Sequence, residues 1–118
     1  MSYGDYRNIV VTVEDTLGTI TLNQPDERNP LDRVTTEEML DAFRALFADP
    51  AVRTLCVTGA GSSFCAGGDL RQMGRFSELP TAEAFAWPER IVELNRLMLT
   101  APKPVIAAVN GAAFAGGM

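Results

Sequence analysis

The sequence predicts an α/β fold in which strands and helices alternate after an opening hairpin. Segments rich in β-branched residues alternate with segments whose apolar residues recur at helical spacing, in the order strand, strand, helix, strand, helix, strand. Glycine-rich segments also follow two of the predicted strands directly. The alternation implies layers of helices and strands, with parallel strand pairing beyond the hairpin.

The first two predicted strands form the hairpin. Residues 8–13 and 17–22 are rich in β-branched side chains and are separated by only three residues. In the second strand Ile20 and Leu22 alternate with threonines, so these two apolar side chains should share one face. The polar segment 23–33 contains two prolines and is predicted to be a loop.

A first helix is predicted to begin near Thr35. Thr35 and Glu38 have the spacing of a capping box, in which each residue satisfies a backbone N–H of the first turn. The Asp49-Pro50 pair should end the helix. Its buried face should consist of Met39, Leu40, Phe43, Leu46 and Phe47.

Two further strands are predicted to be buried, at residues 54–58 and 105–109, because both are short apolar runs. Residues 59–63, which follow the first of these strands, are rich in glycine and serine and are expected to form a turn.

Between these strands the sequence predicts one helical turn at 70–73, a loop at 74–81 and a second long helix. The second helix is expected to start at Trp87-Pro88, since proline suits the first position of a helix. Its apolar stripe should contain Ile91, Leu94, Leu97 and Met98.

Composition excludes several classes of function. The formal net charge is −5 and the basic residues are scattered, which argues against a nucleic-acid partner. The longest apolar run is too short to cross a membrane, and no signal peptide is expected, so a cytoplasmic location is predicted. Histidine is absent, and Cys56 and Cys65 lack metal-ligand spacing, so we expect reduced thiols and no metal.

Two glycine-rich segments, 64–70 and 110–117, are the candidate sites. Each follows a predicted strand, where ligands bind in open α/β sheets, and small residues let a ligand approach main-chain N–H groups. Two such donors converging on one oxygen would form an oxyanion hole. From the residues alone, an alternative is equally open: both segments could be tight turns where helices pack on the sheet.

Functional interpretations of other segments and single residues have less support in the sequence. The run 57–61 resembles the start of a dinucleotide-binding turn, but Phe64 occupies the place of its third glycine. Cys65 has no neighbouring base in the sequence and is expected to be a small packing residue. Asp69 fits a helix cap better than a general base, and Arg28 could hold a phosphate or be merely solvated.

Three motifs in order resemble the enoyl-CoA hydratase/isomerase (crotonase) family. They are ERNPL at 27–31, FCAGGDL at 64–70, and KPVIAAVNG at 103–111 followed by AGG at 115–117. The resemblance extends over essentially the whole chain. It implies a spiral of ββα units, of which residues 1–118 would be the amino-terminal part of a single catalytic domain.

The resemblance also implies site residues and a ligand. Main-chain N–H groups of Gly68 and Gly116 would form the oxyanion hole that stabilises a thioester enolate. Coenzyme A would enter as part of the substrate, with no prosthetic group. The residues implied to contact this acyl-CoA substrate are Arg28 near the phosphates, Leu31 near the pantetheine arm, Ala66 near the adenine, and Gly68, Asp69 and Leu70.

The family's acid/base carboxylates would follow the second glycine segment, beyond Met118. Enoyl-CoA hydratase or isomerase activity is therefore expected only for a complete domain. The alternatives are a non-catalytic subunit for thioester binding or assembly, and a related hydrolase, decarboxylase or dehalogenase. A nicotinamide-dependent reductase is a third and weaker possibility. The family resemblance further implies a homotrimer or a dimer of trimers.

Overall fold

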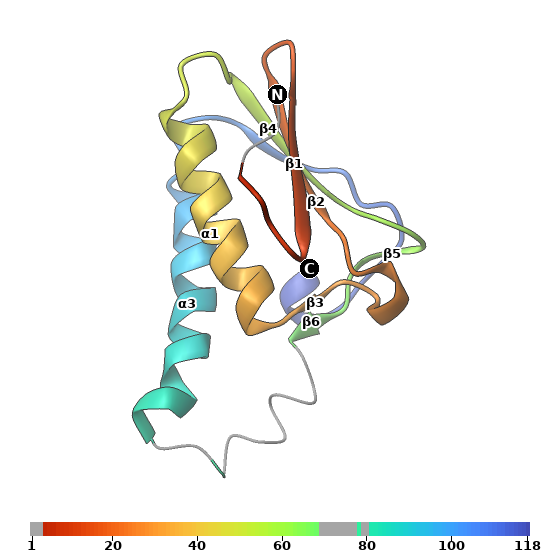
Figure 1. Cartoon of the computed structure of the whole chain (residues 1–118), viewed down its shortest axis with the longest axis vertical. Coiled ribbons are helices and arrows are strands. Elements are labelled where there is room, and N and C mark those ends of the chain that lie inside the picture. The colour runs from red at the N-terminus through yellow and green to blue at the C-terminus, as the bar shows by residue number, and fades with distance from the viewer. Residues whose placement is uncertain (1–3, 69–77, 79–80) are drawn as a thin grey trace.

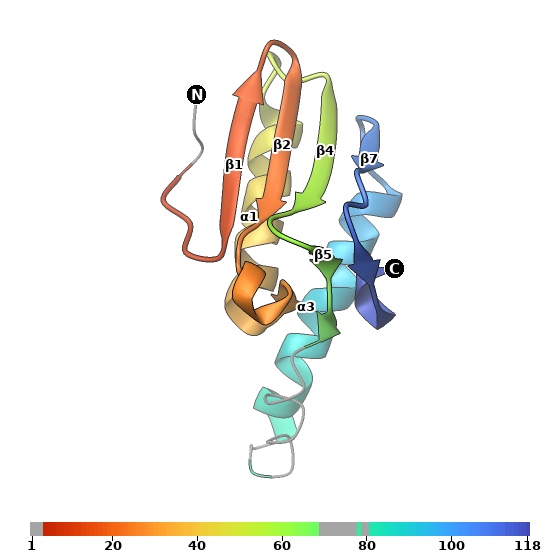
Figure 2. The same cartoon turned by 90° about the vertical axis from the view of Figure 1, so that its right-hand side faces the viewer.

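The computed structural model describes residues 4–68, 78 and 81–118. A four-stranded sheet forms the centre, in the order β1-β2-β4-β7, and two helices lie against one of its faces (Figures 1 and 2). The sheet strands are β1 (Ile9–Glu14), β2 (Leu17–Leu22), β4 (Thr54–Gly59) and β7 (Val105–Ala107). The helices are α1 (Arg33–Ala48) and α3 (Thr81–Leu99).

The pairing of the sheet confirms the predicted topology. β1 and β2 are antiparallel and Glu14 pairs with Leu17, so the hairpin turns through two residues. β2 pairs with β4 in parallel, and β4 pairs with β7 in parallel. Parallel pairing brings the carboxyl ends of β2, β4 and β7 to one end of the sheet, which is where the glycine-rich segments begin.

Four shorter elements lie at that end of the sheet. The strands β3 (Pro30–Leu31) and β6 (Gly67–Gly68) pair in parallel, as do β5 (Ser63–Cys65) and β8 (Ala112–Ala113). Two 3₁₀ turns, η1 (Pro25–Glu27) and η3 (Ala115–Gly117), complete the region. The predicted loop at 23–33 therefore contains two short regular elements, η1 and β3, that the sequence pattern does not reveal. The predicted turn at 59–63 is confirmed, since β4 ends at Gly59 and β5 begins at Ser63.

The core lies between the sheet and α1. Ile20 and Leu55 of the sheet and Phe43 of α1 are all 0% exposed. Gly18 lets the helix come close, because a Cβ there would lie 2.8 Å from a methyl group of Leu46. The predicted helix face is confirmed for Met39, Leu40, Phe43 and Leu46, which are buried, while Phe47 is half-buried and packs on the core.

The predicted cap of α1 is wrong. The N-cap is Asp32, whose carboxylate accepts a hydrogen bond from the Thr35 N–H at 2.7 Å. The Thr35 hydroxyl instead lies 3.1 Å from the side-chain amide of Asn8. The carboxylate of Glu38 accepts from the N–H groups of Arg7 and Asn8, so tertiary contacts take up both groups of the expected capping box.

The predicted start of the second helix is also wrong, since α3 begins at Thr81 and contains Pro88 within it. Residues 82–86 include three alanines and a glutamate, which are strong helix formers, and Pro88 itself forgoes only one backbone donor. The helical turn predicted at 70–73 lies outside the described residues, as does most of the loop predicted at 74–81.

The last strand is not the buried strand that the sequence predicts. β7 spans only Val105–Ala107 and ends the sheet, with β4 as its one neighbour there. Its Ile106 is 54% exposed, and Val109 just after it is 58% exposed. An apolar run indicates burial only where another layer covers it, and no described residue covers these side chains.

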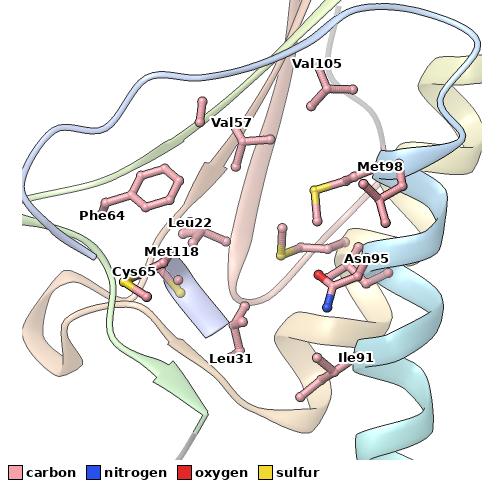
Figure 3. A pocket seen from close by; sticks show the side chains of 15 residues that line it. Leu22, Leu31, Val57, Phe64, Cys65, Ile91, Asn95, Met98, Val105 and Met118 are labelled. Carbon is pink, nitrogen blue, oxygen red and sulfur yellow. The ribbon is translucent and has the colours of Figure 1, made fainter. Parts of the chain in front are cut away.

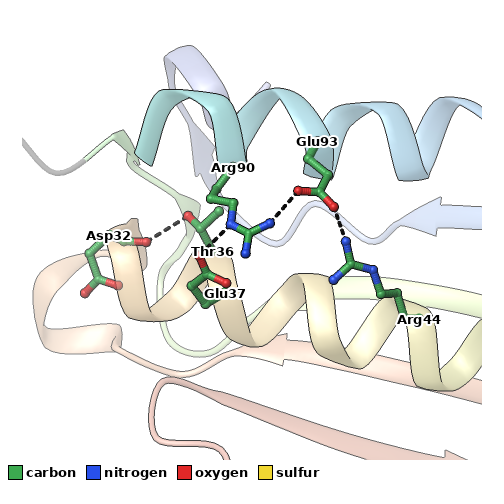
Figure 4. A network of polar contacts seen from close by, with 6 residues as sticks. All are labelled: Asp32, Thr36, Glu37, Arg44, Arg90 and Glu93. Atoms are coloured by element: carbon green, nitrogen blue, oxygen red, sulfur yellow. Dashed lines mark hydrogen bonds and ion pairs between the residues drawn. The ribbon is translucent and has the colours of Figure 1, made fainter. Parts of the chain in front are cut away.

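Ion pairs link the two helices on their outer side (Figure 4). Glu93 of α3 pairs with Arg44 of α1, and Arg90 of α3 pairs with Glu93 at 2.7 Å and with Glu37 of α1 at 2.9 Å. The hydrogen bond from Arg90 lowers the pKa of the Glu93 carboxyl. Such solvent-exposed pairs add little stability, but they fix how α3 lies along α1.

Candidate functional site

The two glycine-rich segments lie side by side at the carboxyl end of the sheet. β5 and β8 pair through Ser63 with Ala112 and Cys65 with Ala113, and the Cys65 carbonyl accepts from the Phe114 N–H at 3.0 Å. Beyond these strands, Cα atoms of β6 come within 8 Å of those of η3. The structure thus brings together the segments that carry Gly68 and Gly116.

Close backbone approach explains why these segments are rich in glycine. A Cβ at Gly117 would clash with the carbonyl oxygen of Cys65, and one at Gly111 would clash with the carbonyl oxygen of Ser62. A side chain at either position would push the second segment away from the first. These glycines therefore fix the distance between the two segments.

Backbone geometry leaves a main-chain donor at Gly116. The first hydrogen bond of η3 runs from the Gly117 N–H to the Phe114 carbonyl at 2.7 Å. The N–H of Gly116 precedes that bond, so the turn itself offers it no acceptor. Within the described parts of the two glycine-rich segments, Gly67 with φ 84° and Ala115 with φ 46° adopt the left-handed conformation.

Several residues predicted to contact coenzyme A lie beside Gly68. Leu31 is paired with Gly68 in the β3–β6 ladder, and the Ala66 N–H donates to the Asn29 carbonyl at 3.2 Å. Arg28 directly precedes Asn29 and is exposed, with no side-chain partner among the described residues. The structure thus places the segment with Arg28 and Leu31 beside the segment with Ala66 and Gly68. Asp69 and Leu70, which are also predicted contacts, lie outside the described residues.

An apolar cavity of about 310 Å³ adjoins this backbone cluster (Figure 3). The sheet, α1 and α3 enclose it, and Leu31, Cys65 and Gly117 connect it to the glycine-rich segments. The other lining residues are Leu22, Met39, Val57, Phe64, Ile91, Leu94, Asn95, Met98, Leu99, Val105, Ala107 and Met118. Its volume lies at the lower end of the ~300–1,000 Å³ range of small-molecule pockets.

Cys65 behaves as the packing residue that the sequence predicts. Its side chain is buried, and burial raises the pKa of the thiol above its usual 9.0. The sulfur accepts from the Gly67 N–H at 3.4 Å, which opposes this effect only in part. A thiol held in its neutral form is a poor nucleophile.

Two asparagines are site residues that sequence reasoning missed. The Asn29 side chain is 1% exposed; its oxygen accepts from the Gln24 N–H at 2.8 Å, and its amide donates to the carbonyls of Ala60 and Ser63. The Asn110 oxygen accepts from the Gly59 N–H at 3.1 Å. Both asparagines belong to the motifs quoted above. Asn110 directly follows an apolar run, which is a signal for it, whereas Asn29 lies between Arg28 and Pro30 and has no such signal.

The described part of the chain shows neither a metal-binding cluster nor a membrane-spanning helix. There, no group of three or more cysteine, aspartate or glutamate side chains is arranged to hold a metal ion. None of the helices in that part is long and apolar enough to span a membrane.

The sequence matches a protein-family model described as enoyl-CoA hydratase/isomerase over residues 12–118. It is 40% identical to a crotonyl-CoA hydratase of Syntrophomonas wolfei over 113 residues, which cover 95% of this chain and 42% of that protein. It is also 35% identical to a hydroxycinnamoyl-CoA hydratase-lyase of Pseudomonas fluorescens, covering 97% of this chain and 42% of that protein.

Solved structures resemble the chain as well. An enoyl-CoA hydratase from Bacillus anthracis superposes with a TM-score of 0.84 at 30% identity, covering 94% of this chain and 43% of that one. An enoyl-CoA hydratase from Shewanella pealeana gives a TM-score of 0.88 at 25% identity, covering 94% of this chain and 42% of that one. The chain thus spans less than half the length of each of these four proteins.

Proposed function

Because the chain belongs to the enoyl-CoA hydratase/isomerase family, we propose that its two glycine-rich segments bind the thioester carbonyl of an acyl-CoA. The observation that carries the proposal is the contact between β6 and η3 at the mouth of an apolar cavity. Gly117 of η3 also lines that cavity, so donors from these two segments, which are distant in sequence, would act beside a space that suits an acyl group.

The proposed donors are the N–H groups of Gly68 and Gly116. When a proton leaves or joins the carbon next to a thioester, negative charge develops on the carbonyl oxygen. Donors fixed in advance around that oxygen stabilise the charge without reorganising, and each is worth about 2.7–4 kcal/mol in comparable sites. The lack of an acceptor for Gly116 within its own turn supports its part in this role.

The rest of the ligand would extend in two directions from the carbonyl. The acyl group would occupy the cavity, whose lining is almost wholly apolar. The pantetheine arm would pass Leu31, which pairs with Gly68, and the adenine would lie near Ala66. Arg28, which is exposed and has no side-chain partner among the described residues, would bind the phosphates. Asp69 and Leu70, which lie outside the described residues, stay predicted contacts of the ligand by family resemblance.

Proton transfer needs acid/base groups. No aspartate or glutamate is among the described residues that line the cavity. By family resemblance, hydration or isomerisation would use carboxylates beyond Met118. The same observation favours a second candidate, a subunit that binds thioesters without converting them. By family resemblance we further propose a homotrimer or a dimer of trimers in the cytoplasm.

Calorimetric titration of the 118-residue chain with acetoacetyl-CoA tests the proposed hole, because its enolate carries negative charge on the thioester oxygen. Gly68→Pro removes the N–H donor, whereas Gly68→Ala keeps it and serves as the control. We expect the proline variant to bind the enolate about 10–100-fold more weakly, the usual value of a hydrogen bond to a charged group. Equal affinities in variants that circular dichroism shows to be folded would refute the assignment.

The two candidate functions differ in turnover. Incubation of the complete domain with crotonyl-CoA, followed by the ultraviolet absorbance of its conjugated double bond, measures hydration directly. Saturable binding without loss of absorbance would favour the binding subunit, and steady loss would favour the enzyme. Absence of binding to any thioester would refute both candidates.

A further inference from the structure

The buried amide of Asn29 holds the backbone that leads into the first glycine-rich segment. The side chain is 1% exposed, and its amide donates to the carbonyls of Ala60 at 3.0 Å and Ser63 at 2.9 Å. Its oxygen accepts from the Gln24 N–H at 2.8 Å. Both N–H groups of the amide and its oxygen are therefore bound within the protein, which fixes the orientation of the side chain.

The main chain of Asn29 holds the same segment a second time, closer to Gly68. Its carbonyl accepts from the Ala66 N–H at 3.2 Å, two residues before Gly68. The strand β3, which follows Asn29 directly, pairs with β6 through only two residue pairs. Pro30 of β3 has no N–H to donate, so this short ladder depends on few hydrogen bonds. The place of the Gly68 peptide therefore depends on that of Asn29.

The backbone around Asn29 is adapted to these contacts. Asn29 has φ 54°, a left-handed conformation that asparagine adopts more readily than most residues. A Cβ at Gly59 would lie 2.9 Å from the amide nitrogen of Asn29 and 2.6 Å from the carbonyl oxygen of Ser63. Glycine at 59 thus lets the amide reach Ser63. Two positions therefore carry backbone requirements that this one contact explains.

Asn110 holds the second glycine-rich segment to the same carbonyl. Its amide donates to the Ser63 carbonyl at 3.3 Å, and its oxygen accepts from the Gly59 N–H at 3.1 Å. Asn110 is the first residue of the segment 110–117, which carries Gly116. The Ser63 carbonyl is therefore a common attachment point for both glycine-rich segments.

The position of a main-chain donor matters more to a charged oxygen than to a neutral one. A hydrogen bond to an ionised acceptor is roughly twice as strong as one between neutral groups, and both kinds weaken steeply as they depart from linearity. A displaced Gly68 N–H would therefore weaken binding of a thioester enolate more than binding of the neutral thioester. A residue that fixes the donor controls this preference, whereas a residue that only stabilises the fold does not.

We propose that Asn29 and Asn110 are positioning residues of the oxyanion hole. Through the Ser63 carbonyl that they share, the two amides fix the N–H of Gly68 relative to the N–H of Gly116. Each asparagine acts through the backbone that it holds and not through contact with the ligand. This inference rests on the proposed function, because it takes these two N–H groups to be the donors.

The test measures how strongly the 118-residue chain prefers an enolate to a neutral thioester. Calorimetry gives its affinities for acetoacetyl-CoA, whose enolate carries the charge, and for butanoyl-CoA, a neutral thioester with the same number of acyl carbons. Asn29→Gly removes the amide but keeps the left-handed backbone and the main-chain carbonyl. We expect it to lower the ratio of the two affinities about tenfold, as a hydrogen bond to a charged group allows. The ultraviolet band of the bound enolate should weaken in parallel.

A second variant and a control accompany this change. Asn110→Ala lies at an exposed position and should lower the ratio less, by about threefold, and it tests the proposal if Asn29→Gly prevents folding. Val11→Ala removes methyl groups from the buried side of β1, outside both glycine-rich segments. It should lower the unfolding free energy but leave the ratio unchanged.

The outcomes separate this inference from the function on which it rests. If circular dichroism shows either asparagine variant to be folded and its ratio equals that of the parent chain, that residue is only structural. The inference is then wrong for it, and the proposed function stands. If Val11→Ala lowers the ratio equally, general loosening explains the effect and the inference is again wrong. If the parent chain binds neither thioester, or binds both equally well, the proposed function fails and the inference with it.

Discussion

Asn29 and Asn110 donate to the same main-chain oxygen, the carbonyl of Ser63, at 2.9 and 3.3 Å. Asn29 comes from the segment before α1 and Asn110 from the segment after β7, and each also bonds the turn that follows β4. The shared acceptor ties three segments together at the point where β5 begins. The two amides thereby position the first glycine-rich segment.

Because the two asparagines share an acceptor, we expect their substitutions to have non-additive effects on the unfolding free energy. Either single change to alanine removes one of these two donors from the Ser63 carbonyl, whereas the double change removes both. The double variant should lose about 1 kcal/mol more unfolding free energy than the sum of the single variants. Urea denaturation of the four proteins measures the difference, with Asn23→Ala at an exposed position as the control. Additive losses would contradict the shared role.

Lys103 caps the carboxyl end of α1 from a distant part of the chain. Its ammonium group donates to the carbonyls of Leu46 at 2.8 Å and Asp49 at 2.6 Å. Both the hydrogen bonds and the helix dipole favour a cation there, so Lys103→Met should cost about 1–2 kcal/mol of unfolding free energy. Lys103→Arg keeps the charge and should recover part of the loss. Thermal unfolding that is unchanged in the methionine variant would rule out the cap.

Because of Tyr6, we expect the unfolding free energy of the protein to fall at alkaline pH. Burial and then the hydrogen bond to Asp41 raise the pKa of its phenol above the usual 10.0. Above pH 10.0 the unfolded chain loses this proton while the native chain keeps it, so the unfolding free energy falls as pH rises. Tyr6→Phe should flatten this fall, as chemical denaturation on both sides of that pH would show.

A residual alkaline slope should persist in the Tyr6→Phe variant, because burial also raises the pKa of the Cys65 thiol. Asp41→Asn removes the hydrogen-bonding carboxylate but not the burial, and its slope should be intermediate. Identical pH profiles for Tyr6→Phe and the parent chain would show that the phenol does not contribute.

Ala115 adopts a left-handed backbone conformation, with φ 46°. A side chain in this conformation costs about 1–2 kcal/mol relative to glycine, because Cβ crowds the following carbonyl. Ala115→Gly should therefore raise the unfolding free energy by about 0.5–1 kcal/mol after the added chain entropy is allowed for. Ala113→Gly in β8 should instead lower it by about 0.5–1 kcal/mol. Equal effects of the two changes would contradict the assigned backbone conformation.

The sequence by itself determined the fold class, the family and the approximate elements. Apolar periodicity predicted the hairpin, the long helix after it and the parallel strand that follows, and the structure confirms them. The match to the enoyl-CoA hydratase/isomerase model and the similar solved structures confirm the crotonase-like fold that three short motifs indicated. Periodicity and motifs are local, so they can be recognised without knowing what packs against them.

Only the tertiary structure decided which groups meet. The Glu38 carboxylate caps the entry to β1 and not its own helix, and β7 is exposed because it ends the sheet. The neighbouring positions of β6 and η3, the pairing of two asparagines on Ser63 and the apolar cavity likewise depend on contacts between distant segments. Such contacts follow from how the layers pack, and local residue patterns carry no record of that packing.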